Sequence, residues 1–469
     1  MKYQLHFFYD YVLPNFIMPN ALNPQMGIIN YIHTLYHSGA TTDAFLERDV
    51  GDGRDTVLGR IFGNHMGMWP PTLRHNGPHL RYPCYKDLVD IHEDAVYLGK
   101  QKRTKYIYPI KLNPHIDEFV ANGHAGCKIH GEYFWKYMSQ ESLDDVRTGN
   151  AVIFLDWAQE NYVSKAHFHI LHQIIGMANL PKHSVILGHN SFNAEEMYES
   201  MFDDNERILQ VKSWPFLMFQ YSHRYGTEPN SRMTEDNFYS TKHAVRPHSF
   251  LFRNRRAREY RIALLYKMAS DNILDSGDWS LLDPVPYEKS LTMANMYPMG
   301  YDIAAVNELH KRIPHQLVTE PEGNFYNIAG WSDTRAVHSM NSYFDITTES
   351  YMIGSYKSFT EKICKPLLNF QPFLLVGFHR GLELLRSLGF KTFSPWIDES
   401  YDIEPSDSLR LSMIYKEIHR LATMPKEQLH NWYWEMEHIL VHNHRHFVDF
   451  HKHDQYNINF IKYLESRIT

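Results

Sequence analysis

Glu361 and Lys362 place a carboxylate and an ammonium side by side where the spacing predicts an amphipathic helix over 359–370. A helix start exposes unpaired backbone N–H groups and a partial positive charge, so it attracts anions. Lys362 would add a full charge for a diphosphate, and an ionised Glu361 could accept hydrogen bonds from the two hydroxyl groups of a ribose. The pair therefore fits a nucleotide diphosphate, and the alternative is an ordinary helix start with solvated charges.

The densest basic stretch of the chain follows a predicted strand, SFLFRN, at 249–254. Its arginines are Arg253, Arg255, Arg256, Arg258 and Arg261. The planar guanidinium group suits phosphate oxygens. Because the stretch follows a strand, we predict that Asn254, Arg255 and Arg261 belong to the site and that Arg258 is left to solvent.

Two series of strands and helices must position these residues. Between 151 and 225 the strand candidates AVIFLDW, SVILGHN and LQVKSWPFLMFQYS alternate with the helical patterns AHFHILHQIIGMANL and NAEEMYESMF. Strand and helix alternating at this pitch indicate a parallel α/β unit, with His189 and Asn190 at the end of a strand where open sheets place ligands.

A second series begins after the polar stretch 226–248. We predict strands at SFLFRN, SYFDITTES, QPFLLVG and KTFSPWI. We also predict an amphipathic helix after the arginines, with one side formed by Ile262, Leu265, Met268 and Ala269. Pro366 should kink or shorten the helix at 359–370, and IYKEIHRLATM and EQLHNWYWEMEHILVHNH should form long helices.

A chain of 469 residues exceeds the usual size of a single core, so at least two lobes are expected. We predict an N-terminal lobe over 1–240, with a Gly/Pro/His-rich insertion near 50–90, and a C-terminal lobe over 241–469. The fold class is α/β with two Rossmann-like lobes.

The composition narrows the class of protein. A net charge of −7 does not suggest a protein held mainly by nucleic-acid phosphates. Three widely spaced cysteines favour a reducing interior over a disulfide framework. The sequence has neither a signal-peptide pattern nor an apolar run of membrane-spanning length, so a cytoplasmic protein, of a cell or an infected host, is expected.

Four segments in this order resemble the C-terminal lobe of a family of glycosyltransferase-like proteins of bacteria, phages and large viruses. They are FLFRNRRAREYRIALLYKMASDNILDSGDWSL, SYFDITTES, FTEKICKPLLNFQPFLLVG and LRSLGFKTFSPWIDESYD. The Thr-Glu-Lys element is also similar to the donor-binding part of fucosyltransferases. The resemblance, over 250–450, implies a GT-B fold, a nucleotide-sugar donor, and donor contacts by Thr360, Glu361 and Lys362, with Asn254 and Arg255 beside them.

The sequence departs from this family at His379-Arg380-Gly381, where small residues are more usual. It has no two aspartates spaced two apart, so the Asp-x-Asp metal motif is missing and a metal-free mechanism without cofactor is expected. The histidine groups 167/169/172 and 438/442/444/446 lack H-E-x-x-H, and we interpret the second as a solvated helix end rather than a zinc site.

The sequence does not identify the acceptor. An inverting transferase needs a general base near the acceptor hydroxyl, and Glu160, followed by Asp10, is our candidate in the first lobe. The acceptor could be a glycan, a protein or a modified nucleic-acid base. Two alternatives to the transferase stay open: a non-catalytic sugar- or nucleotide-binding structural protein, and a phage or viral enzyme that glycosylates modified DNA bases.

Overall fold

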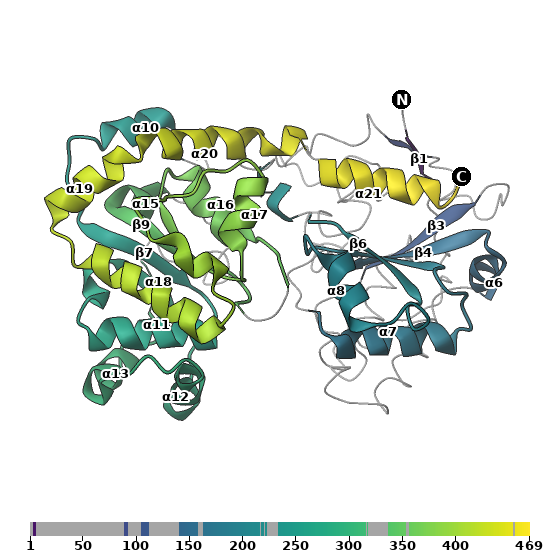
Figure 1. The fold of residues 1–469 in the computed structure, drawn as a ribbon, viewed down its shortest axis with the longest axis horizontal. Helices are drawn as coiled ribbons and strands as arrows, with labels where there is room; N and C mark the ends of the chain where they lie inside the picture. Colours follow the sequence, from purple (N-terminus) through teal and green to yellow (C-terminus); the bar gives the residue numbers. More distant parts are fainter. Residues whose placement is uncertain are drawn as a thin grey trace, which may run out of the picture. The chain divides into compact units, whose positions relative to one another are not determined.

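The computed structural model describes residues 3–5, 89–91, 105–111, 140–157, 163–215, 217–219, 221–222, 233–315, 317, 336–352, 356–453 and 455–469. Its contacts divide the chain into two compact units, one made of Met1–Leu217 with Asp454–Thr469 and the other of Met218–His453. Each unit contains a four-stranded sheet flanked by helices (Figure 1). The predicted α/β class is confirmed for both.

The sheet of the first unit runs in the order β3 (Tyr106–Lys111), β4 (Ala151–Trp157), β5 (Val185–His189), β6 (Leu209–Ser213), and every neighbouring pair is parallel. Its helices include α6 (Gln140–Thr148), α7 (Lys165–Met177) and α8 (Ala194–Met201). A separate parallel pair joins β1 (Tyr3–Leu5) to β2 (Val89–Ile91). The alternation predicted from residue 151 onward is confirmed, but the third strand, predicted over 209–222, ends at Ser213.

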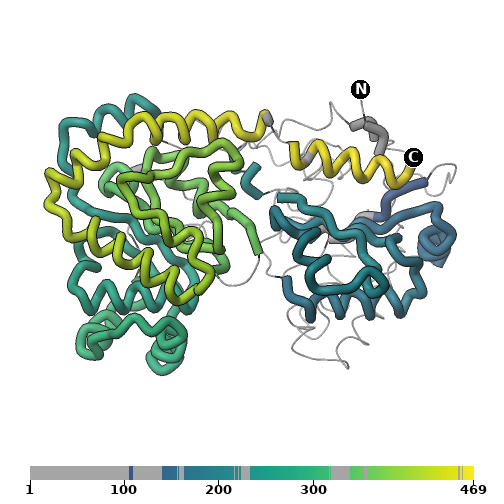
Figure 2. Tube along the Cα trace, in the orientation of Figure 1, coloured from purple at the N-terminus to yellow at the C-terminus, as the bar shows by residue number. Residues whose placement is uncertain are grey.

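The last helix of the chain, α21 (Gln455–Ser466), belongs to the first unit. Phe460 stacks on Trp214 with ring centroids 4.7 Å apart and also contacts the ring of Phe154. Figure 2 shows this helix in yellow beside the first sheet. The sequence placed one boundary near residue 240 and assigned 241–469 to one lobe. The structure divides the chain after Leu217. The C-terminal helix belongs to the first unit, where Phe460 stacks on Trp214.

The sheet of the second unit has the order β10 (Phe373–Val376), β9 (Ser342–Thr348), β7 (His248–Asn254), β8 (Asp278–Leu281), again all parallel. Its helices are α10 (Glu235–Ser240), α11 (Glu259–Ser270), α12 (Tyr287–Asn295), α13 (Ile303–His310), α15 (Ala336–Asn341), α16 (Glu361–Leu368), α17 (Gly381–Ser387), α18 (Asp407–Ala422), α19 (Lys426–Glu435) and α20 (Glu437–Asp449). Every residue of β9 and β10 is buried, as expected when helices cover both faces of a parallel sheet, whereas β7 and β8 each include half-buried residues.

Helix α11 is buried on nearly every side rather than on one face. Ile262, Leu265 and Met268 are buried as predicted, whereas Ala269 is half-buried. Tyr260 and Arg261 are buried as well. The helix packs against α12, α13 and α18 as well as lying beside the sheet (Figure 1). An amphipathic pattern assumes one covered face, so the prediction of a half-exposed helix was wrong here.

The segment KTFSPWI, predicted as a strand, forms turns instead. Its backbone donors bond to side chains, because Phe393 N donates to Glu399 Oε1 at 2.5 Å and Lys391 N donates to Asn443 Oδ1 at 2.8 Å. The apolar alternation arises because Phe393 and Ile397 are buried from a loop. Helix α16 ends at Leu368, two residues after Pro366, so it is shorter than the segment predicted over 359–370.

Candidate functional site

Buried polar residues gather where the strands of the second sheet end. Because β7, β8, β9 and β10 are parallel, their carboxyl ends share one edge of the sheet. Asn254 ends β7, and Glu349 and Ser350 follow β9 directly; all three side chains are buried. Open parallel sheets bind ligands at this edge. With Thr360, Glu361 and Lys362 these residues form what we call the carboxyl-edge cluster.

Helix α16 begins at the same edge. Thr360 is its N-cap, and the Thr360 hydroxyl accepts a hydrogen bond from Lys362 N. Thr360 in turn donates its backbone N–H to Glu349 Oε1 at 3.3 Å and its hydroxyl to Glu349 Oε2 at 2.6 Å. The helix start is therefore tied to the end of β9 by a carboxylate that sequence reasoning did not single out. The sequence contained one indication of its role: Glu349 is a charged residue directly after the seven residues of β9, all of which are buried.

The Lys362 ammonium lies at the centre of the cluster. Its Nζ donates to Glu361 Oε1 at 2.9 Å, to Thr360 Oγ1 at 3.0 Å and to Ser350 Oγ at 3.2 Å. The Lys362 side chain keeps 20% of its surface exposed, whereas that of Glu361 keeps 6%. A partly exposed cation at a helix start, next to an acceptor-only carboxylate, can bind an anion and a hydroxyl group together.

Glu349 is the most buried charged group of the cluster, with none of its surface exposed. Burial raises the pKa of Glu349 above the usual value, while the Lys362 charge and the hydrogen bonds from Thr360 act in the opposite direction. A carboxylate in this position depends on its two donors and its neighbouring cation for stability.

Asn254 contributes a hydrogen-bond donor to the cluster. Its Oδ1 accepts a hydrogen bond from Thr348 Oγ1 at 2.8 Å, and its side chain is 1% exposed. The Asn254 Nδ2 group is buried and has no hydrogen-bond partner among the residues that the structure describes. Buried polar groups without partners are uncommon in proteins, and an amide donor of this kind suits an acceptor oxygen from a ligand.

The predicted arginines have different surroundings. Arg261 is buried, and its guanidinium donates to the carbonyl oxygens of Arg256, Thr348 and Glu349. Arg255 lies one residue beyond β7, half-buried, and its carbonyl oxygen accepts hydrogen bonds from two backbone N–H groups after β8. Arg261 therefore braces the backbone around the cluster instead of presenting its charge to solvent.

Arg258, which the sequence left to solvent, lies over the ring of Tyr351 with its guanidinium carbon 5.0 Å from the ring centroid. Arg253 pairs with Asp345 at 3.0 Å. Each of these side chains has a protein partner, so a basic stretch in the sequence does not translate into a continuous phosphate-binding surface.

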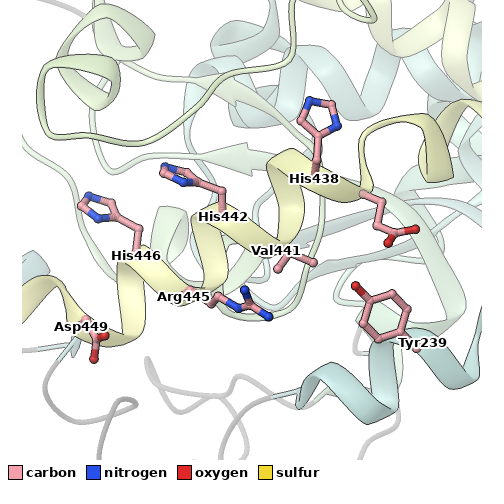
Figure 3. Close-up of a pocket in the computed structure, with 8 residues that line it drawn as sticks. Tyr239, His438, Val441, His442, Arg445, His446 and Asp449 are labelled. Atoms are coloured by element: carbon pink, nitrogen blue, oxygen red, sulfur yellow. The ribbon is translucent and has the colours of Figure 1, made fainter.

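Three histidines project from α20 along one face, His438, His442 and His446 (Figure 3). Two of them donate to backbone carbonyl oxygens, His442 Nε2 to Gly389 O at 3.0 Å and His446 Nε2 to Leu388 O at 2.8 Å. Leu388 is the C-cap of α17, so the imidazoles satisfy carbonyl groups that the end of a helix leaves without partners.

His444 has the same function for α16. It is buried and donates from Nδ1 to Leu368 O, the last residue of that helix, at 2.8 Å. The interpretation of this histidine group as a solvated helix end was therefore wrong: three members are helix-end donors. In the earlier group, His172 Nε2 lies 2.8 Å from Tyr198 Oη, and burial lowers the pKa of His172 to about 4.

Within the described ranges, no group of three or more His, Cys, Asp or Glu side chains could hold a metal ion. Surface hollows occur between α10 and α20 (Figure 3) and around the turn at 394–400. Neither hollow is lined by residues of the carboxyl-edge cluster. Their charged walls are occupied by internal pairs such as Arg445 with Glu235 at 2.7 Å and Arg420 with Glu417 at 2.7 Å.

The candidate general bases Glu160 and Asp10 lie outside the described residues. The carboxyl ends of the first sheet do carry buried polar residues, as predicted at His189 and Asn190. His189 Nδ1 accepts a hydrogen bond from Ser191 N at 3.1 Å, and Asn190 Oδ1 accepts one from Leu217 N at 3.2 Å. No helix in the described part of the chain is long and apolar enough to cross a membrane.

No protein-family model matches the chain, and no curated protein matches it. Among solved structures, an α,α-trehalose-phosphate synthase (UDP-forming) from Burkholderia vietnamiensis is 10% identical, over 74% of this chain and 78% of that one, with a TM-score of 0.35. The α,α-trehalose 6-phosphate synthase of Burkholderia multivorans is 9% identical, over 78% of this chain and 71% of that one, with a TM-score of 0.35.

The N-terminal domain of Candida albicans trehalose-6-phosphate phosphatase is 9% identical, over 100% of this chain and 97% of that one, with a TM-score of 0.40. Likenesses with TM-scores of 0.35 to 0.40 do not establish a shared fold or activity.

Proposed function

We propose that the protein is a glycosyltransferase that moves a sugar from a nucleotide-sugar donor to an acceptor hydroxyl. The observation that carries the proposal is the carboxyl-edge cluster. An ammonium group, a carboxylate and an amide donor meet there at a helix start and at the carboxyl ends of parallel strands. This combination suits a diphosphate, a ribose and a further acceptor oxygen within one site.

In this proposal each residue of the cluster contacts a different part of the nucleotide-sugar donor. Lys362 and the N–H groups at the start of α16 bind the diphosphate, and the Glu361 carboxylate accepts hydrogen bonds from the ribose hydroxyls. Asn254 Nδ2 donates to a phosphate or sugar oxygen. Arg255 adds a second positive charge, and Arg261 supports the site through the backbone.

The reaction breaks the bond between the anomeric carbon and the diphosphate oxygen and forms a bond to the acceptor oxygen. The leaving diphosphate carries the electron pair toward Lys362, which stabilises the negative charge that develops in the transition state. The acceptor proton passes to a general base, for which Glu160 is proposed first and Asp10 second. In this scheme Lys362 and the helix dipole supply the positive charge without a metal ion or other cofactor.

A GT-B arrangement follows from this proposal, with the donor in the second unit and the acceptor in the first. The acceptor is a glycan, a protein or a modified nucleic-acid base. The absence of an Asp-x-Asp pair from the sequence supports metal-free transfer.

The proposal is tested by incubating the protein with UDP-, GDP-, ADP-, dTDP- and CMP-sugars without metal and measuring sugar release or transfer. Lys362→Ala should reduce the affinity for the active donor about 10- to 100-fold, the effect of losing a charge-assisted contact of roughly 1.5–3 kcal/mol. No binding of any donor by the wild type, or unchanged binding by Lys362→Ala, rejects the site.

Lys267→Ala is the matched control. Lys267 pairs with Asp271 at 2.8 Å and its side chain is 22% exposed, close to the 2.9 Å and 20% of Lys362. It lies in the last turn of α11, at the opposite end of that helix from the sheet edge that carries the cluster. Its loss should leave donor affinity within about twofold of the wild type, the margin expected for independent sites.

A further inference from the structure

Glu349 makes none of the donor contacts proposed above, yet its backbone N–H and carbonyl group form three hydrogen bonds to neighbouring elements. Its N–H donates to Val376 O of β10 at 2.9 Å. Its carbonyl oxygen accepts hydrogen bonds from Tyr260 Oη and from Arg261 Nη2 of α11. The residue after β9 is thus fixed by both a neighbouring strand and a buried helix.

Both carboxylate oxygens of Glu349 are used by one residue, Thr360. The Thr360 hydroxyl donates a hydrogen bond to Oε2, so the lone pairs of that hydroxyl are left as acceptors. They accept the hydrogen bonds from Lys362 Nζ at 3.0 Å and from Lys362 N at 3.4 Å. The direction of the hydroxyl, and with it the contact between Thr360 Oγ1 and the Lys362 ammonium group, depends on Glu349.

We propose that Glu349 is a positioning residue of the donor site, which orients the Thr360 hydroxyl so that Lys362 is held ready for the donor diphosphate. The inference rests on the proposed function. It assigns the buried carboxylate a task in donor binding that acts through Thr360 and Lys362.

A carboxylate suits this task better than its neutral counterpart. Thr360 presents two donors, its N–H and its hydroxyl, and two carboxylate oxygens accept both. The amide of a glutamine has one oxygen, so its NH₂ group would meet one of the two donors or would reverse the hydroxyl. A fully buried carboxylate costs stability, and a role in presenting Lys362 accounts for its presence.

The test is a double-mutant cycle on binding of a nucleoside diphosphate. Calorimetric titrations with UDP, GDP, ADP and dTDP identify the tightest ligand, which is then measured with Glu349→Gln, Lys362→Ala and the double variant. Glu349→Gln should weaken binding about tenfold, and in the Lys362→Ala background less than about twofold, because the effect passes through the ammonium group. Glu349→Asp, which keeps two acceptor oxygens, should bind more tightly than Glu349→Gln.

Glu399→Gln is the matched control, because Glu399 also accepts from a backbone N–H and a threonine hydroxyl. Its affinity should equal that of the wild type. Binding by Glu349→Gln within twofold of the wild type overturns the inference, as does an equal loss in both backgrounds. If Glu349→Gln does not fold, the same cycle is run with Thr360→Val, which removes the hydroxyl that Glu349 orients, and the same criteria apply. If the wild type binds none of the four diphosphates, the proposed function itself is rejected and the inference with it.

Discussion

Two glutamates of the second unit are held in nearly the same way. Glu349 accepts a backbone N–H and a hydroxyl from Thr360, with the Lys362 ammonium beside them. Glu399 accepts the N–H of Phe393 at 2.5 Å and the hydroxyl of Thr392 at 2.8 Å. Burial raises the pKa of both carboxyl groups.

The group of residues around Glu399, which we call the loop cluster, differs from the carboxyl-edge cluster in the elements that its hydrogen bonds connect. Glu399 ties together the loop between α17 and α18, and its cation, Arg386, lies at 3.2 Å with 44% of its side-chain surface exposed. Glu349 ties the end of a central strand to the start of a helix, and its cation is partly covered. The bonding pattern alone does not mark a functional site. Its position at the carboxyl edge of a parallel sheet does, because strand ends and helix starts present donors and charge to one place there.

Removing the threonine hydroxyl should give the largest difference between the two clusters in stability and in nucleotide affinity. Thr360→Val leaves the fully buried Glu349 without its hydroxyl donor and should cost about 1–3 kcal/mol in the free energy of unfolding, measured by urea titration. It also removes an acceptor of Lys362, so nucleotide affinity should fall. Thr392→Val should cost about 0.5–1.5 kcal/mol, because Glu399 is partly solvated, and should leave the affinity unchanged.

An equal loss of nucleotide affinity in Thr360→Val and Thr392→Val would break the distinction between the clusters. Loss only in Thr392→Val would move the candidate site to the loop. Titration of both variants with the same nucleoside diphosphate decides between these outcomes.

The pH dependence of stability should show a smaller difference. Burial places the pKa of folded Glu349 above its ordinary value of 4.5, so folding binds the proton more tightly and this stabilisation is lost as pH rises. The wild type should therefore lose stability relative to Glu349→Gln as pH rises from about 4.5 through the folded pKa. A pKa difference of one unit corresponds to about 1.4 kcal/mol.

Glu399→Gln should show the same sign with a smaller amplitude, because the Glu399 side chain keeps 10% of its surface exposed and Glu349 none. The measurement is the difference in unfolding free energy between each variant and the wild type at several pH values. A wild type that gains stability relative to Glu349→Gln with rising pH would contradict the origin given for the shifted pKa.

The elements with regular apolar runs could be predicted from the sequence. AVIFLDW, SFLFRN and QPFLLVG are strands because continuous apolar residues fit a sheet covered on both faces. KTFSPWI has a similar local pattern but forms a loop, because side chains of Glu399 and Asn443 take its backbone donors. Local periodicity carries no information about contacts with residues that are distant in the sequence. The packing of α21 in the first unit was missed for the same reason.

Part of the candidate site was also predictable. Thr360, Glu361 and Lys362 stand out by residue type and spacing, and the structure brings them together with Asn254 at one sheet edge. Glu349 was missed because a single glutamate after a strand is common, and its burial becomes visible only once β9 is central in the sheet. Arg261 was predicted to bind the donor, yet its contacts are to carbonyl groups, which a charge pattern cannot distinguish from phosphate contacts.

The location of the donor site can be measured directly by hydrogen–deuterium exchange with and without the nucleoside diphosphate that binds most tightly. We expect slower exchange in peptides covering 349–352 and 356–368, where Glu349, Thr360 and Lys362 lie, and no change in peptides covering 391–403. Protection confined to 391–403, or to α20 beside the hollow of Figure 3, would contradict the assignment of the nucleotide to the carboxyl-edge cluster.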